Sequence, residues 1–245
     1  MLSKFSGGGN PMLKNGFSQT TSTSYVSDDQ GVMTIQGAIN KTFILFGVML
    51  ITAYFNFQAQ NSILMIGGAV VGLILVIVNV FKKEYSPFIA PAYAAVEGLF
   101  VGGISGIYAG FGGGIVIQAI SLTLLVLFIM LIIQKTGIIP VTNQFRTGVI
   151  MATGSIALLY LLSFVLSLFG IHIPFIHEGG TIGIIFSLGV IAIASLNLLL
   201  DFDMIVKGEQ YGAPKYMEWF SAMGLMITLV WLYFEILRLL GKMRN

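Results

Sequence analysis

Residues 181–206 read TIGIIFSLGVIAIASLNLLLDFDMIV and place a carboxylate, Asp201, directly behind 20 residues that carry no charge. As a helix, a run of this length crosses the ~30 Å hydrocarbon core of a bilayer at ~1.5 Å per residue. A carboxylate at or near membrane depth is costly, so it must be paired, protonated or hydrated. Asp201 is therefore the first candidate for an ion or proton site.

The whole chain has the composition of a membrane protein. It is 56% apolar and 9% charged, and its mean hydropathy is +0.93. Soluble domains carry roughly 25% charged residues. The sequence predicts an all-α polytopic membrane protein with seven transmembrane helices. The apolar segments lie at 42–57 (extendable back to residue 35), 63–81, 87–111, 114–133, 147–169, 181–206 and 216–240.

Residues 1–39 form the one extended polar segment, and eighteen of them are Gly, Ser, Thr or Asn. Such a composition contains too little apolar surface to offset the entropy of ordering the chain. We expect a mobile tail over 1–39 in front of a seven-helix membrane domain over 40–245. The tail is either a plain extension or a handle for a partner.

Loop charge predicts the orientation. The first, third and fifth connections carry no Lys or Arg, whereas the N-terminal segment and the even connections do. The positive-inside bias therefore places the N-terminus in the cytoplasm. Seven crossings would leave a basic C-terminus outside, against this bias, but a full last span is still favoured. The basic residues at issue are Lys82, Lys83, Lys135, Arg146, Lys207 and Lys215 in the connections, and Arg238, Lys242 and Arg244 at the C-terminus.

The third segment has a stripe of small residues. Gly98, Gly102 and Gly106 recur every four residues, a spacing that lets helix backbones approach closely in lipid. Glu97 lies beside this stripe, where packing alone gives no reason for a carboxylate. It serves either a structural pairing or a polar pathway.

The sixth and seventh segments carry the remaining candidate polar groups. Asn197 lies one turn before Asp201, so the two side chains can bind a shared ligand or water. Glu235 and Arg238 share a face of the last segment and can form an internal ion pair. Glu218, near the start of that segment, is expected at the membrane interface.

Enzyme chemistry is not expected. An intramembrane aspartyl protease needs two facing Asp residues. Asp201 and Asp203 are two residues apart on one helix and point in different directions, and no other apolar segment contains an Asp. The chain has no Cys and two His. We expect no bound cofactor and no nucleic-acid partner, while the oligomeric state stays open.

Several motifs together resemble one family. They are YAAVEGL at 93–99, NLLLDFD at 197–203, GAPKYMEW at 212–219, LYFEILRLL at 232–240 and NPML at 10–13. This pattern resembles the Bax-inhibitor family (transmembrane Bax-inhibitor motif proteins), and in particular its bacterial YccA-like branch, over about residues 10–242.

The resemblance implies a multi-pass protein of the bacterial inner membrane whose last helix lies at the centre of the other six. It also implies a pH-sensitive calcium leak, controlled by two acids that share a proton. Asp201 matches the first acid and would contact Ca²⁺ transiently. The seventh-helix acid falls on Thr228 here, so the partner must be Glu97, Glu218 or Glu235.

The alternative implied by the same resemblance is an interaction protein that binds and restrains the membrane-anchored AAA protease FtsH. Residues 1–39 would then bind the protease, and the carboxylates would only hold the bundle together. A secondary transporter is a distant third reading, because the sequence has no pair of matching broken helices.

Overall fold

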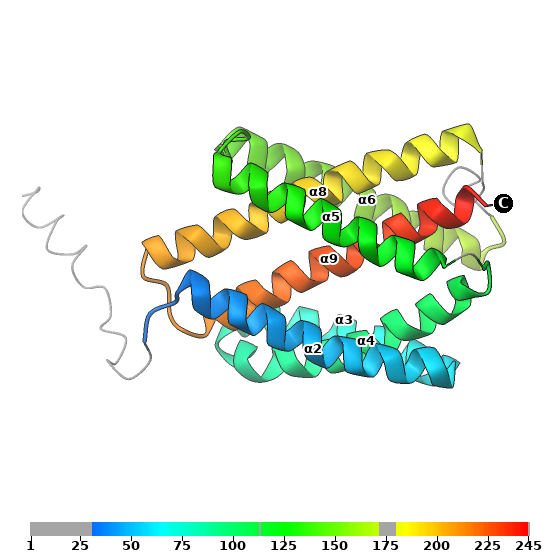
Figure 1. Ribbon diagram of the computed structural model, residues 1–245, viewed down its shortest axis with the longest axis horizontal. Helices are drawn as coiled ribbons and strands as arrows, with labels where there is room; N and C mark the ends of the chain where they lie inside the picture. Colours follow the sequence, from blue (N-terminus) through cyan, green and yellow to red (C-terminus); the bar gives the residue numbers. More distant parts are fainter. Residues whose placement is uncertain (1–30, 113, 172–179, 245) are drawn as a thin grey trace, which may run out of the picture.

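The structure, a computed structural model, describes residues 31–112, 114–171 and 180–244 (Figure 1). Within these residues the regular structure is helical, apart from an isolated antiparallel bridge between Val32 and Pro214. The helices are α2 (Ile35–Ala59), α3 (Ser62–Phe81), the short 3₁₀ helix η1 (Lys83–Tyr85), α4 (Ser86–Ala109), α5 (Ile115–Thr136), α6 (Asn143–Leu168), α8 (Thr181–Gln210) and α9 (Met217–Lys242). Seven of them are long and apolar enough to cross a membrane, which confirms the predicted fold class.

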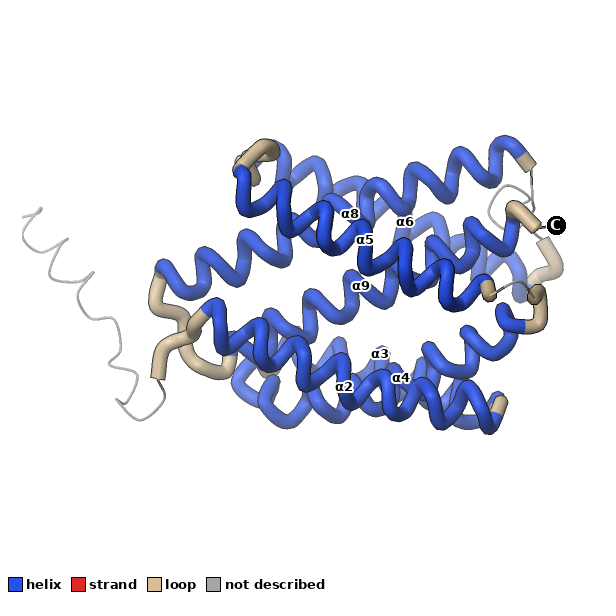
Figure 2. The backbone as a smooth tube through the Cα atoms, viewed as in Figure 1, coloured by secondary structure: helices blue, strands red, loops and turns tan. Residues whose placement is uncertain are grey.

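The helix ends follow from local sequence. Thr34 caps α2, with its hydroxyl accepting from the Gly37 N–H, and Asn61 caps α3 through two backbone N–H groups. α5 ends at Thr136 and is followed by the cap residue Gly137, whose positive φ of 66° suits glycine. The connections that the structure describes in full, such as those between α2 and α3 and between α5 and α6, are short (Figure 2). They leave little irregular backbone, which hydrocarbon would not tolerate.

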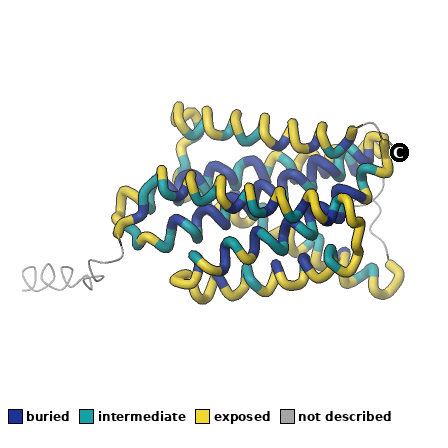
Figure 3. The backbone as a smooth tube through the Cα atoms, turned by 60° about the horizontal axis from the view of Figure 1, so that its bottom comes forward, coloured by how far each residue is buried: buried dark blue, intermediate teal, exposed yellow. Residues whose placement is uncertain are grey.

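The helices form two groups with α9 between them. In Figure 1, α2, α3 and α4 lie on one side of α9, and α5, α6 and α8 lie on the other. α9 packs against α2, α4, α5 and α8. Of the most apolar stretch of α9, 72% is buried inside the protein, whereas the corresponding share in the next most buried span is 50%. α9 is thus the most buried of the seven spans, and Figure 3 shows the buried backbone concentrated in the interior.

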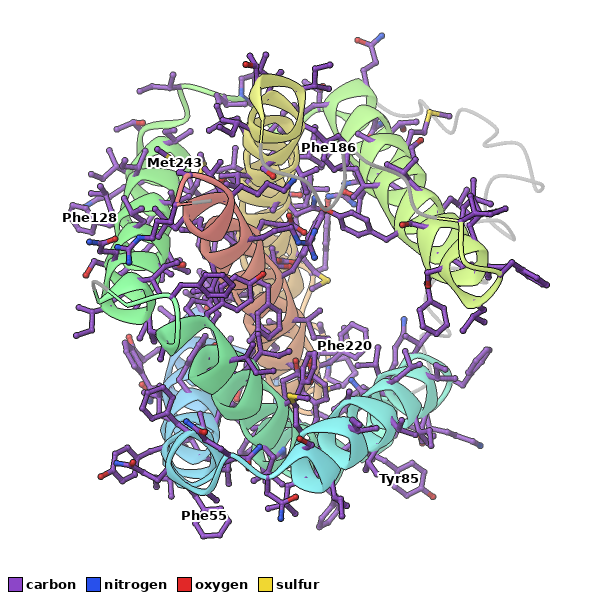
Figure 4. All side chains as sticks on the ribbon, turned by 90° about the vertical axis from the view of Figure 1, so that its right-hand side faces the viewer. Phe55, Tyr85, Phe128, Phe186, Phe220 and Met243 are labelled. Atoms are coloured by element: carbon purple, nitrogen blue, oxygen red, sulfur yellow. The ribbon has the colours of Figure 1, made fainter. Side chains whose placement is uncertain are left out.

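The outer helices present large apolar side chains to their surroundings. Phe55 of α2 and Phe128 of α5 are 60% and 62% exposed and point away from the bundle (Figure 4). α6 is the least buried span, at 11%, and packs against α8. A bilayer solvates such surfaces as well as a protein core does, so they cost nothing in lipid.

α2 and α4 pack closely at two of the three glycines of the predicted stripe. A Cβ at Gly98 would meet the Thr52 hydroxyl and the Met49 backbone, and a Cβ at Gly102 would meet the Ala53 backbone. At Gly106 a Cβ would make ordinary contacts of 3.6 Å or more. The absence of side chains at Gly98 and Gly102 therefore lets the two backbones approach.

The structure moves the predicted boundary between tail and membrane domain. α2 begins at Ile35, so a boundary between residues 39 and 40 falls inside a helix. Met33 is 1% exposed, and its N–H donates to the Ala213 carbonyl at 2.8 Å. Residues 31–39 belong to the bundle because tertiary contacts supply the burial that their composition alone does not. The rest of the predicted tail, residues 1–30, lies outside the described residues.

The basic C-terminus is bound to the protein. Lys242 is 6% exposed and donates to the Gly183 carbonyl and the Ser187 hydroxyl, both at 3.1 Å. Arg244 donates to the Gly112 carbonyl and to Gln118. The positive-inside bias describes charges in loops, whereas these charges are held by polar groups of the bundle. The last segment accordingly forms α9, a helix of spanning length.

Candidate functional site

Asp201 of α8 faces α9, and the Thr228 hydroxyl of α9 is the polar group beside its carboxylate. The second carboxylate oxygen, Oδ2, is buried and has no hydrogen-bond partner. The Ser221 hydroxyl is the other buried side-chain oxygen without a partner among the described residues. A buried carboxylate oxygen without a donor costs free energy.

Thr228 has one hydroxyl proton and two possible acceptors. Its Oγ1 lies 3.3 Å from the Gly224 carbonyl of its own helix, and it also faces Asp201. If Asp201 carries a proton, that proton can go to Thr228 while Thr228 donates to Gly224. If Asp201 is ionised, Thr228 must turn its proton to the carboxylate. The contact can therefore exist in two hydrogen-bonding arrangements that differ by one proton.

Asp203, two residues further along α8, has a different environment. It accepts a hydrogen bond from Lys207 at 2.8 Å and pairs with Arg146 of α6. These two cations neutralise it and tie α8 to the first turn of α6. Of the two acids in the Asp-Phe-Asp motif, Asp201 is thus the one that pairs with no cation of the described residues.

Glu235 lies in a separate cluster nearer the end of α9. It is 1% exposed and accepts from the Tyr160 hydroxyl at 2.9 Å, from Trp231 Nε1 at 3.2 Å and from Arg238 Nη1 at 3.2 Å. The Arg238 guanidinium also lies 4.9 Å from the centre of the Tyr160 ring and donates to its hydroxyl at 2.7 Å. The ion pair expected from the sequence is present, and Tyr160 connects it to α6.

Glu218 is fully buried within the protein. Its carboxylate accepts from the Thr34 N–H at 2.9 Å and from the Thr34 hydroxyl at 3.0 Å, and it pairs with Lys215 at 3.0 Å and with Lys41. Four donors from α2 and the α8–α9 connection satisfy this carboxylate. It is not available to share a proton with Asp201.

Glu97 faces α3. It is 8% exposed, the Tyr93 side chain lies beside it one turn earlier, and its Oε2 lies 3.1 Å from where a Cβ at Gly72 would be. Gly72 thus leaves room for the carboxylate between α3 and α4. The three acids proposed from the sequence as partners of Asp201 each have other neighbours, and the structure places Thr228 in that position.

Asn197 binds α6 and not Asp201. Its amide nitrogen donates to the Thr153 hydroxyl at 2.7 Å and to the Ile193 carbonyl at 2.9 Å. Both amide protons are therefore in use. These two bonds tie α8 to α6, and the joint action of Asn197 and Asp201 on one ligand stays a prediction.

The carboxylates of the described residues do not converge. No three Asp, Glu or His side chains there lie close enough together to hold a metal ion. A calcium ion at Asp201 would have this one carboxylate and otherwise neutral oxygens as ligands. Resident Ca²⁺ sites use six to eight oxygens with several carboxylates, so this arrangement suits a passing contact better than a stable site.

Thr228, Tyr160 and Thr153 are the site residues that sequence patterns did not single out as polar partners. Thr228 had a signal, since counting back from the Leu237-Arg238-Leu239 ending places it at the seventh-helix acid position. No sequence pattern pointed to Tyr160 or Thr153, because a hydroxyl in an apolar helix does not reveal which neighbour it faces.

Two comparisons with known proteins bear on identity. A family model described as Bax inhibitor 1 like matches residues 10–245. A search of curated proteins found no match to the chain.

Proposed function

We propose, from the premise that this chain belongs to the Bax inhibitor 1-like family, that it is a pH-sensitive cation leak of the bacterial inner membrane. Ca²⁺ is the permeant ion we propose, the N-terminus is cytoplasmic, and the contact between Asp201 and Thr228 is the gate. One observation carries the proposal: Asp201 lies between α8 and the buried helix α9 with an oxygen that has no partner.

The closed state has a protonated Asp201. The neutral acid donates to Thr228, Thr228 donates to the Gly224 carbonyl, and the hydrogen-bonded chain joins α8 to α9 without a net charge. This arrangement excludes water, because its donors have acceptors within the bundle.

The open state follows loss of this proton. An ionised Asp201 has no cation beside it, in contrast to Asp203, Glu218 and Glu235. A lone charge at this depth must attract water or a cation, since leaving it dry is costly. Water then enters between α8 and α9, and the carboxylate offers a hard oxygen ligand that suits Ca²⁺.

This mechanism uses one titrating carboxylate. The resemblance implies two acids that share a proton, but here the second position is Thr228, which supplies a hydroxyl. We therefore expect flux to rise with pH as a single-proton titration, without the two separated steps that a coupled pair of acids produces.

The test is calcium flux into dye-loaded proteoliposomes between pH 6 and pH 8. Asp201→Asn should abolish the pH dependence, because an amide cannot lose a proton in this range. Glu84→Gln is the matched control, since it makes the same exchange at an exposed carboxylate of η1. Flux absent at every pH, or a pH dependence that survives in Asp201→Asn, would refute the assignment.

The second candidate is an interaction protein that modulates the AAA protease FtsH through the N-terminal tail. It is favoured by the anchoring of Met33, which leaves residues 1–30 attached to a fixed point of the bundle. Deleting residues 1–30 tests it: a leak keeps its flux, whereas a protease modulator loses its effect. The deletion must stop at residue 30, because residues 31–39 include Thr34 and the first turn of α2.

A further inference from the structure

Residues 31–41 contact the end of α8 and the beginning of α9, two helices that lie far from this segment in the sequence. Val32 forms a bridge with Pro214, and Met33 donates to Ala213, so the segment is bonded to the α8–α9 connection. Met33 also packs on α8, where a Cβ at Gly208 would lie 2.6 Å from its sulfur. The segment thus spans the closed end of the α8–α9 hairpin before α2 begins.

Two carboxylates from this hairpin cap the N-terminus of α2. The Thr34 N–H donates to Glu218 of α9, and the Ile35 N–H donates to Glu209 of α8, each at 2.9 Å. These N–H groups have no partners within their own helix, and the helix N-terminus attracts negative charge. One helix end therefore binds α8 and α9 at the same time.

Glu218 is the centre of this junction. It is fully buried, and its donors come from both sides of the contact: Thr34 and Lys41 from α2, and Lys215 from the α8–α9 connection. Lys41 also lies 5.4 Å from the centre of the Trp219 ring. Separating α2 from α9 would leave a buried carboxylate without most of its donors, which is costly.

The junction lies on the same two helices as Asp201 and Thr228. Asp201 precedes Glu209 by eight residues and Thr228 follows Glu218 by ten, which correspond to ~12 Å and ~15 Å along the helix axes. Helices transmit such displacements with little bending. A shift of α9 against α8 at the closed end of the hairpin must therefore appear at the Asp201–Thr228 contact.

We propose that residues 31–41 are a latch that sets the position of α9 against α8, and that releasing it opens the Asp201–Thr228 contact. The inference rests on the site described above but not on which ion passes there. Residues 1–30 precede the latch directly, so a pull on them acts first on Val32 and Met33.

A single cysteine reports this opening, because the chain contains no Cys. Thr228→Cys places a thiol at a position that is 9% exposed, and its rate of reaction with N-ethylmaleimide in proteoliposomes measures access to the contact. Adding Glu218→Gln should raise this rate about tenfold, since hydrogen bonds to a buried charge are lost. Adding Glu84→Gln, the control, should leave it unchanged.

A milder variant covers the case in which Glu218→Gln does not fold. Thr34→Val removes one hydroxyl donor and leaves the pairs with Lys41 and Lys215, so we expect a smaller rise in labelling. A folded variant of either kind whose labelling rate equals that of the control overturns the latch. Raised labelling without calcium flux keeps the latch and refutes the leak, so the two failures are distinguishable.

Discussion

Gly102→Ala should destabilise the bundle by forcing α4 away from α2. A Cβ at Gly102 would lie 2.8 Å from the carbonyl carbon of Ala53 and 2.9 Å from its Cα, and closer still to the carbonyl oxygen. All three atoms are backbone, so no side chain can rotate out of the way. The helices themselves must separate or shift.

Two opposing contributions set the size of the change in unfolding free energy. Alanine is favoured over glycine in a helix interior by about 1 kcal/mol. Overpacking a tight contact costs about 1–3 kcal/mol. Gly47→Ala in α2 gains the helix preference of alanine without the cost of overpacking, because nothing lies within 4 Å of its Cβ position. The two variants should thus differ in unfolding free energy by about 1–3 kcal/mol, with Gly102→Ala the less stable.

The measurement is reversible unfolding by SDS in mixed micelles, followed by tryptophan fluorescence. Both tryptophans, Trp219 and Trp231, lie in α9, so the signal reports on the buried helix and not on the periphery. Equal stability of the Gly102→Ala and Gly47→Ala proteins would refute the close approach of α2 and α4.

Two further predictions concern the polar contacts of α9. Thr228→Asp should give Asp201 a neighbouring carboxylate, so the two acids should lose their protons in two separate steps and the pH profile of flux should spread over a wider range; a profile that stays that of a single proton would contradict the contact. Tyr160→Phe removes the hydroxyl between Glu235 and Arg238 but keeps the ring, and should lower the unfolding free energy by about 1–3 kcal/mol because a buried charge loses a donor. The same SDS titration measures this loss, and an unchanged midpoint would show that the cluster does not hold α6 to α9.

The sequence alone was enough to predict the seven spans. Their apolar runs are long, and lipid leaves the backbone no alternative to hydrogen bonding within each helix. The same reasoning identified Asp201, because a carboxylate after an uncharged run stands out without knowledge of its neighbours. α2 begins at Ile35, ahead of the expected boundary between residues 39 and 40, and the segment before it is held by contacts with residues far away in the chain.

Only the tertiary structure decided which carboxylates have partners. Thr34 is 184 residues from Glu218, Tyr160 is 75 residues from Glu235, and Thr153 is 44 residues from Asn197. Hydropathy specifies that a helix is apolar, but not its rotation or its neighbours, so Glu97, Glu218 and Glu235 were equivalent candidates. Packing separates them: Glu218 and Glu235 have hydrogen-bond donors, Glu97 lies beside Tyr93, and Asp201 faces a threonine with one oxygen that has no partner among the described residues.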